Sequence, residues 1–189
     1  MKRLLFTAFL GLLLPASGLA LELQSVLERT MVSPPASVQF REERYNRMFA
    51  ESMWLTGYLE YLEGGQLRKV VQTPFEESFY VRSDRIEIER HGEIEVLPIK
   101  QSRALKTMLS GIEAILAGDT ERLEKAFRYE LTGTEADWSL QLTPRSRRVA
   151  RQLNGLTVKG DDNDVTSIRF ELQGGEWHMM EIQNSPAEQ

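Results

Sequence analysis

The sequence predicts an α+β fold in which one strongly curved antiparallel sheet carries helices on its concave side. The first observation is that apolar residues alternate with polar ones in many short segments separated by turn residues, which is typical of an antiparallel meander. The second is that helical spacing occurs in only two places, at 21–31 and within 102–127, each with one apolar stripe. A sheet with one apolar face and two helical segments with one apolar stripe each can remove these apolar surfaces from water by packing against each other.

The first twenty residues predict a secretory signal peptide. Two basic residues precede the apolar run 4–14, and small residues stand at Gly18 and Ala20, so cleavage is expected after Ala20. The run is shorter than the roughly 20 residues that a membrane-spanning helix needs, so no transmembrane anchor is expected. The chain has no cysteine, which excludes disulfides and an acylated N-terminal cysteine. We therefore expect a mature, single-domain periplasmic protein comprising residues 21–189.

The charge balance argues against nucleic acid as a partner. Acidic residues outnumber basic ones, 28 to 23, whereas phosphate backbones require concentrated Lys and Arg. The one concentrated positive patch is Arg145-Ser146-Arg147-Arg148 with Arg151. It could meet an anionic lipid headgroup or an acidic partner. A solvated turn at a strand edge, where charge prevents edge-to-edge pairing, is the preferred interpretation.

The first half of the mature chain predicts one helix and then a meander. A short amphipathic helix is expected at 21–31, ended by Ser33-Pro34-Pro35. The strand expected at 53–62 is apolar on both alternating sets of positions, which predicts cover on both faces. Glu63-Gly64-Gly65 is a turn, so the next strand should form a hairpin with it. The other strands expected here are 38–41, 66–73, 79–81, 86–89 and 94–97.

In the second half, two helices interrupt the sheet before it resumes. The stripe beginning at Leu105 follows Ser102 and closes at Gly118. Asp119 can cap a second short helix that runs through Phe127. Strands are then expected at 138–143, 152–159, 165–172 and 177–182, which brings the sheet to about nine or ten strands.

No catalytic, cofactor or metal-binding residue is predicted, and we do not expect an enzyme. His91 and His178 are far apart and are expected to be ordinary surface histidines. The sequence contains neither a G-x-S-x-G elbow nor a phosphate-binding loop. Three pairs of adjacent acidic residues are expected to be solvated strand or turn residues: Glu42 with Glu43, Glu76 with Glu77, and Asp161 with Asp162.

A set of short motifs occurs in a characteristic order. The motifs are Gly57-x-Leu59-x-Tyr61, Pro74-x-Glu76, a central helical segment ending at Gly118-Asp119, Phe127, and Trp138-x-Leu140-x-Leu142-x-Pro144. In this order the mature chain resembles, over nearly its whole length, the LolA-like outer-membrane lipoprotein carriers of Gram-negative bacteria, and more closely their divergent branch.

The resemblance implies an incomplete β-barrel lined with apolar side chains and lidded by helices. Such a carrier receives acyl chains from an inner-membrane donor, shields them in the periplasm and delivers them to an outer-membrane acceptor. Exposing an acyl chain to water costs about 0.8 kcal/mol per CH₂, so the task needs an apolar hollow and no catalytic group. In the founding carriers a Lys-Arg-Pro step latches the lid, but this chain has Leu62-Glu63-Gly64 there. The lid could close through Glu63 and a basic residue on a helix, or by apolar contact alone.

We therefore predict a carrier of lipoproteins or other acylated, hydrophobic cargo in the periplasm. One alternative is an envelope scaffold or sensor with the same fold and a closed core, and a less favoured one is a small periplasmic hydrolase. A connected apolar void of about 300–1,000 Å³ would favour the carrier, and a filled core the scaffold. The residues predicted to line the cargo site are Leu55, Leu59, Tyr61, Ile86, Ile88, Met108, Leu109, Ile112, Ile115, Trp138, Leu140 and Leu142.

Overall fold

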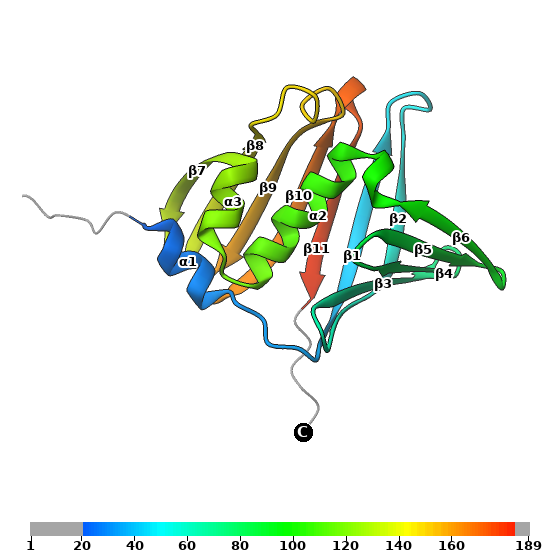
Figure 1. Cartoon of the computed structure of the whole chain (residues 1–189), viewed down its shortest axis with the longest axis horizontal. Helices are drawn as coiled ribbons and strands as arrows, with labels where there is room; N and C mark the ends of the chain where they lie inside the picture. The colour runs from blue at the N-terminus through cyan, green and yellow to red at the C-terminus, as the bar shows by residue number, and fades with distance from the viewer. Residues whose placement is uncertain (1–20, 184–189) are drawn as a thin grey trace, which may run out of the picture.

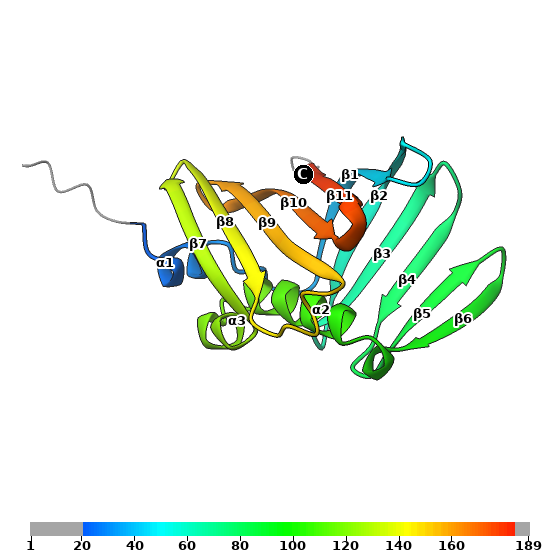
Figure 2. The same ribbon diagram turned by 90° about the horizontal axis from the view of Figure 1, so that it is seen from above.

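The computed structural model describes residues 21–183, which form one strongly bent sheet with helices on its concave side (Figure 1). Figure 2, a view from above, shows the strands in an arch with α2 and α3 beneath it. The predicted signal peptide and its cleavage point at Ala20 lie outside the described residues. Within residues 21–183, every helix is too short or too polar to cross a bilayer.

Eleven strands make up the sheet of the described residues. They are β1 (Ala36–Asn46), β2 (Glu51–Leu62), β3 (Gln66–Thr73), β4 (Glu77–Val81), β5 (Arg85–Arg90), β6 (Glu93–Pro98), β7 (Phe127–Thr134), β8 (Asp137–Pro144), β9 (Leu153–Asp161), β10 (Asp164–Leu172) and β11 (Trp177–Gln183). Their order is β6-β5-β4-β3-β2-β1-β11-β10-β9-β8-β7, and every neighbouring pair is antiparallel. The expected curved antiparallel sheet is thus confirmed, and it does not close, because β6 and β7 are its two edges.

The helices are α1 (Leu23–Arg29), α2 (Arg103–Leu116) and α3 (Thr120–Ala126), with short 3₁₀ turns η1 (Ile99–Gln101) and η2 (Gln173–Gly175). The Ser102 side chain caps α2 by accepting a hydrogen bond from the Leu105 N–H, and Asp119 caps α3 in the same way through the Arg122 N–H. Gly118 has a φ of 66°, in the left-handed region that helix C-termini often use. The predicted boundaries of both central helices are therefore confirmed, except that Phe127 begins β7.

The sheet bends sharply at Gly57, in the middle of β2. Gly57 pairs with Phe40 on one side and Val71 on the other, and the register shifts between Thr56 and Gly57. A Cβ atom at this position would lie 1.9 Å from the carbonyl oxygen of Val70, so only glycine allows β3 this close. Figure 1 shows the result: β3, β4 and β5 run across the direction of β1 and β2.

Three expectations about elements were wrong. The strand β7 was not predicted: its inward residue Phe127 was assigned to the preceding helix, and the remaining inward apolar residues, Tyr129 and Leu131, are too few to reveal alternation. The first strand continues to Asn46, well beyond 38–41. The β2 strand is not covered on both faces, because Trp54 on the convex face is 44% exposed. No second layer of structure covers Trp54 within the described residues; the Arg41 guanidinium lies over its ring, 4.0 Å from the centroid.

Candidate functional site

The pairing registers place the predicted lining residues of the sheet on one face. In an antiparallel ladder, residues directly opposite each other point to the same side. On β8, Leu140 lies opposite Val158, and on β2, Leu55 lies opposite Glu42. Following these pairings across the sheet puts the eight predicted strand residues on its concave face: Leu55, Leu59, Tyr61, Ile86, Ile88, Trp138, Leu140 and Leu142.

Beneath the three helices, the concave face is filled. The helix residues Leu27, Ile115 and Leu123 pack there against the inner sides of β7 to β10 in one large cluster. Close approach is possible because Gly111 of α2 faces the Phe127 ring, and a Cβ atom on Gly111 would lie 2.9 Å from it. Six predicted lining residues belong to this closed region: Met108, Ile112, Ile115, Trp138, Leu140 and Leu142.

The other part of the concave face is lined by two smaller clusters. One consists of strand residues only, centred on Phe40, Leu55 and Val71, with Leu59 at its margin. In the other, Leu109 of α2 packs against Ile86 and Ile88 of β5. Tyr61 lies at the end of β2 on the same face and is half-buried. The structure thus distributes the predicted lining residues other than Tyr61 over three packed clusters, and their role in binding cargo stays a prediction.

A group of charged side chains interrupts the concave face at β1, β3 and β11. Glu42 is 2% exposed and pairs with the Lys69 ammonium. The Arg44 Nε atom donates to Glu42 Oε1 at 3.0 Å, and His178 Nδ1 lies 3.6 Å from the same oxygen. Glu77 is 3% exposed and pairs with Arg90 on the same face. We call Glu42, Arg44, Lys69 and His178 the charged cluster.

Burial sets the protonation of this cluster. Desolvation lowers the pKa of Lys69 to about 8, although the Glu42 carboxylate opposes that shift. Desolvation, reinforced by Arg44, also lowers the pKa of His178. Burial alone would raise the pKa of Glu42, but Lys69 and Arg44 together outweigh it and hold the pKa below its usual value. At neutral pH the cluster therefore contains a carboxylate, two cations and a neutral imidazole.

The two buried carboxylates contradict one expectation, because Glu42 and Glu77 were expected to be solvated. His178, expected to be a surface histidine, is partly exposed at 34% and faces Glu42. A signal for the carboxylates was present in the strand alternation: Glu42 has the same parity as Phe40, and Glu77 has the same parity as Phe79. His91, by contrast, is exposed in the β5–β6 turn. Among residues 21–183, no group of His, Asp and Glu is arranged to hold a metal ion.

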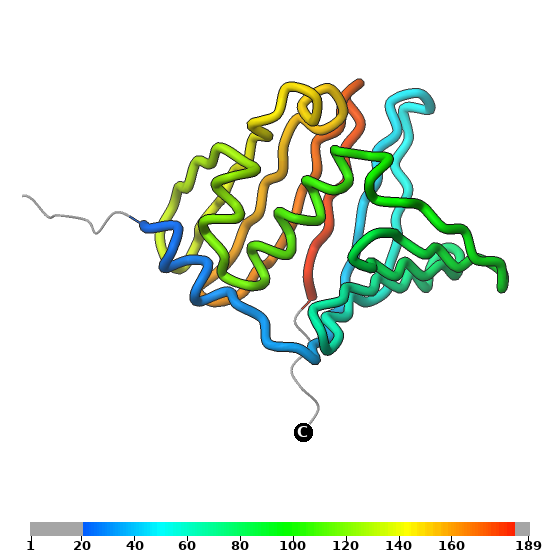
Figure 3. Tube along the Cα trace, in the orientation of Figure 1, coloured from blue at the N-terminus to red at the C-terminus, as the bar shows by residue number. Residues whose placement is uncertain are grey.

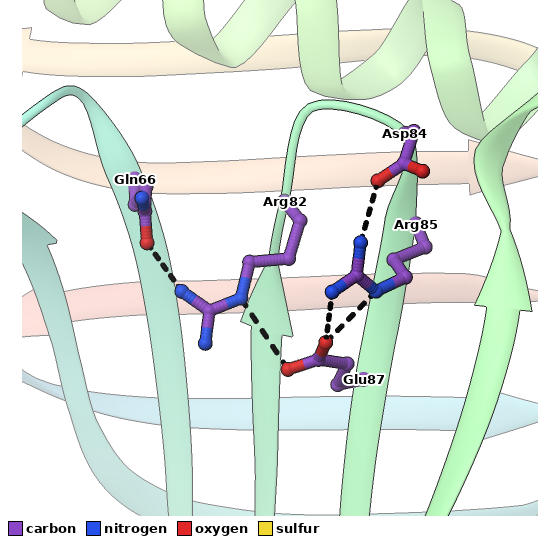
Figure 4. A network of polar contacts seen from close by, with 5 residues as sticks. All are labelled: Gln66, Arg82, Asp84, Arg85 and Glu87. Atoms are coloured by element: carbon purple, nitrogen blue, oxygen red, sulfur yellow. Dashed lines mark hydrogen bonds and ion pairs between the residues drawn. The ribbon is translucent and has the colours of Figure 1, made fainter.

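Two hollows of the described residues lie away from the predicted lining. One, of about 300 Å³, lies on the convex side between Tyr80, Glu87 and Ile94. Figure 4 shows the charged side chains beside it: Arg82 and Arg85 both bind Glu87, the latter at 2.8 Å. The other, of about 420 Å³, is lined largely by polar and charged residues near the β5–β6 turn, Glu77 and His91 among them. Glu63, considered as a substitute latch, is exposed and forms no ion pair within residues 21–183.

A family model described as outer membrane lipoprotein carrier protein LolA-like matches residues 15–181. Among curated proteins, no sequence matches the chain at a significant level.

Several solved structures are similar to the chain in fold. A LolA superfamily protein from Nitrosomonas europaea is 11% identical, with a TM-score of 0.43 over 87% of this chain and 93% of that one. The lipoprotein LppX of Mycobacterium tuberculosis is 13% identical, with a TM-score of 0.46 over 87% and 96%. In the Pseudomonas aeruginosa MucA/MucB complex, the matched chain is 14% identical, with a TM-score of 0.41 over 88% of this chain and 59% of that one. At such low identities and TM-scores the likeness bears on nothing beyond the fold.

Proposed function

Because the chain belongs to the LolA-like family of outer membrane lipoprotein carrier proteins, we propose that it carries acylated or otherwise hydrophobic cargo through the periplasm on the concave face of its sheet. In this proposal an inner-membrane donor supplies the cargo and an outer-membrane acceptor receives it. The work is done by binding and release, without a catalytic step.

The observation that carries the proposal is the apolar strand-only cluster on the concave face. Phe40, Leu55 and Val71 are buried by other strands rather than by a helix. An acyl chain entering here would replace contacts within a curved sheet and would not have to displace the helix–sheet core around Leu140. Each buried CH₂ contributes about 0.8 kcal/mol, so a long acyl chain can offset the cost of opening this region.

Opening would involve the N-terminal end of α2. Leu105 and Leu109 are the α2 residues that pack on the β5 side, against Ile86 and Ile88. The rest of the helix contributes Ala114 and Ile115 to the large cluster. A small displacement of the first turns of α2 would therefore expose the apolar concave side of β5, next to the strand-only cluster, while the C-terminal turns stay packed. Cargo binds the open state with higher affinity than the closed state, and this difference in affinity shifts the protein from closed to open.

One observation favours the scaffold as a second candidate. Within residues 21–183 all of the predicted lining residues except Tyr61 are packed into clusters, and neither of the two hollows described above lies among them. A chain that never opens would use its fold to bind another envelope protein and would take up no acyl cargo.

Two leucines on β2 offer a matched test of the carrier. Leu59 lies on the concave face and Leu62 on the convex face, and both are half-buried. Native mass spectrometry of the chain beginning at Leu21 would record uptake of a fatty-acyl probe. Leu59→Gln should weaken uptake about tenfold, since a polar group replaces an apolar contact with the chain. Leu62→Gln should bind as the parent does.

The outcome separates the two candidates. Equal loss in both variants would indicate a general effect on folding, which circular dichroism would reveal. Failure of the parent protein to take up any acyl probe, with a native fold, would reject the carrier in favour of the scaffold.

A further inference from the structure

The turn between β1 and β2 presents two large apolar side chains to solvent. Met48 is 85% exposed and Phe49 is 68% exposed. The Ala50 N–H donates to the Arg47 carbonyl at 3.3 Å, and the Met48 N–H donates to Asn46 Oδ1 at 2.8 Å. These bonds hold Met48 and Phe49 at the two central positions of a tight turn. Such positions usually carry Gly, Asn, Asp, Ser or Pro, so two exposed apolar residues there call for a partner that covers them.

The loop between β8 and β9, residues 145–152, presents arginines at the same end of the sheet. Arg147, Arg148 and Arg151 are exposed, and none of them forms an ion pair with another residue of 21–183. The loop itself is anchored, because Val149 is 2% exposed within the large cluster and Arg145 Nε donates to the Phe127 carbonyl at 2.9 Å. The loop is held in place while its arginines face solvent.

Hydrogen bonds join these two segments through the β10–β11 turn. Arg47 Nη1 donates to the Gly174 carbonyl at 2.9 Å, and the Gln173 N–H donates to the Gln152 carbonyl at 3.0 Å. Figures 1 and 3 show the three turns along the same upper edge of the molecule. We call this surface the basic rim: Arg47, Met48, Phe49, Arg147, Arg148 and Arg151.

The charge of the basic rim is opposite to that of the whole chain. The segments 46–51, 145–152 and 173–176 hold five arginines and two glutamates, whereas the chain has a net charge of −5. A projecting apolar tip beside unpaired arginines matches the boundary of an anionic bilayer, where apolar side chains enter the headgroup region and cations meet lipid phosphates. An acidic protein would satisfy the arginines but would need its own pocket for Met48 and Phe49.

We propose that the basic rim docks this protein reversibly on an anionic lipid bilayer. The apolar tip supplies the inserted part, and the arginines supply the long-range attraction and the lipid selectivity. This docking does not depend on whether the concave face binds cargo.

Co-sedimentation with vesicles tests the docking. The chain beginning at Leu21 would be used, so that the apolar run 4–14 cannot itself enter the bilayer. It should bind vesicles of phosphatidylcholine containing phosphatidylglycerol, bind weakly to phosphatidylcholine alone, and be released by salt. Replacing Arg147, Arg148 and Arg151 together by Gln should reduce binding about a hundredfold. The Met48→Ser/Phe49→Ser variant should reduce it about tenfold and leave the lipid selectivity intact.

Two controls keep the result specific. Lys159→Gln removes one exposed charge at the opposite end of β9 and should have no effect, whereas Arg148→Gln alone should weaken binding several-fold. Replacing the three arginines by Lys keeps the positive charge that attracts the protein to an anionic bilayer, so bilayer binding should survive. The proposal is overturned if anionic vesicles are not bound, if phosphatidylcholine is bound equally well, or if the Lys variant loses binding, since positive charge would then not be what holds the protein on the bilayer.

Discussion

The two ends of the sheet bury their concave sides in different ways. Strands β7 to β10 are covered by three helices, and their side chains form one large apolar cluster. Strands β1 to β5 curve where β2 bends at Gly57, and their concave side holds two smaller apolar clusters with the charged cluster beside them. The comparison teaches that one curved sheet can bury one part of its concave side in a single core shared with helices. The other part has smaller apolar clusters and charged groups that water can hydrate, so we expect it to require less free energy to open.

The largest expected effect comes from equal truncations in the two regions. Leu140 on β8 and Leu55 on β2 are both fully buried leucines on strands. Leu140→Ala should lower the free energy of unfolding by about 4 kcal/mol, since helices and sheet together fix the cavity that results. Leu55→Ala should cost about 2 kcal/mol, because the bent sheet can settle around the smaller side chain. Urea unfolding of both variants measures the difference, and equal costs would remove the proposed contrast between the regions.

The next effect concerns the charged cluster. Glu42→Gln would leave the largely buried Lys69 cation without its carboxylate partner, and we expect a loss of about 3 kcal/mol. Adding Lys69→Met to that variant should recover much of the loss, because the unpaired charge is then gone. Thermal unfolding of the two single variants and the double variant gives the coupling. If the stability losses of Glu42→Gln and Lys69→Met simply add in the double variant, Glu42 and Lys69 are hydrated rather than paired, and this region is already open in solution.

The last effect is a dependence of stability on pH, which over any one pH unit is smaller than the losses above. The pKa of Lys69 is about 8 in the folded protein and 10.5 as its ordinary value, so the unfolded chain holds the extra proton between these limits. Stability should therefore decrease as the pH falls from 10.5 to 8, by at most about 1.4 kcal/mol per pH unit. His178 adds a decrease in the same direction as the pH falls below 6.5.

Chemical unfolding over this pH range tests the two contributions separately. Lys69→Met should remove the slope above pH 8, and His178→Gln should remove the slope below pH 6.5. A Leu140→Ala control should shift the whole curve without changing its shape. An unchanged curve in Lys69→Met would mean that this lysine is solvated in the folded protein.

Alternation along the strands made the faces of β2, β5 and β8 predictable, since Leu55, Ile88 and Leu140 have the expected parity. The apolar stripe after Ser102 made α2 predictable, and the cap at Asp119 made α3 predictable, because short-range spacing and hydrogen bonds define those ends. The edge strand β7 was harder to predict, since it has little apolar surface to bury.

The candidate site was less accessible to prediction than the fold. Whether Glu42 meets Lys69 depends on the pairing of β1 with β2 and of β2 with β3, which single-strand patterns do not contain. The turn at 46–51 also lay outside any periodic pattern, so the exposure of Met48 and Phe49 could not be inferred. The Glu42–Lys69 contact depends on long-range strand pairing, and the exposure of Met48 and Phe49 depends on turn geometry, and neither can be read from local sequence patterns.

The position of β1 in the sheet has a consequence for how the chain folds. β1 pairs on one side with β2, its nearest neighbour along the chain, and on the other with β11, the last strand, so that Gln39 meets Gln183. The centre of the sheet therefore cannot assemble until the chain has emerged as far as β11. Such a long loop closure slows folding and leaves an edge of β1 unpaired in the meantime. Folding of this chain should thus be limited by the arrival of its C-terminal strand, and truncation before Trp177 should leave a species that aggregates.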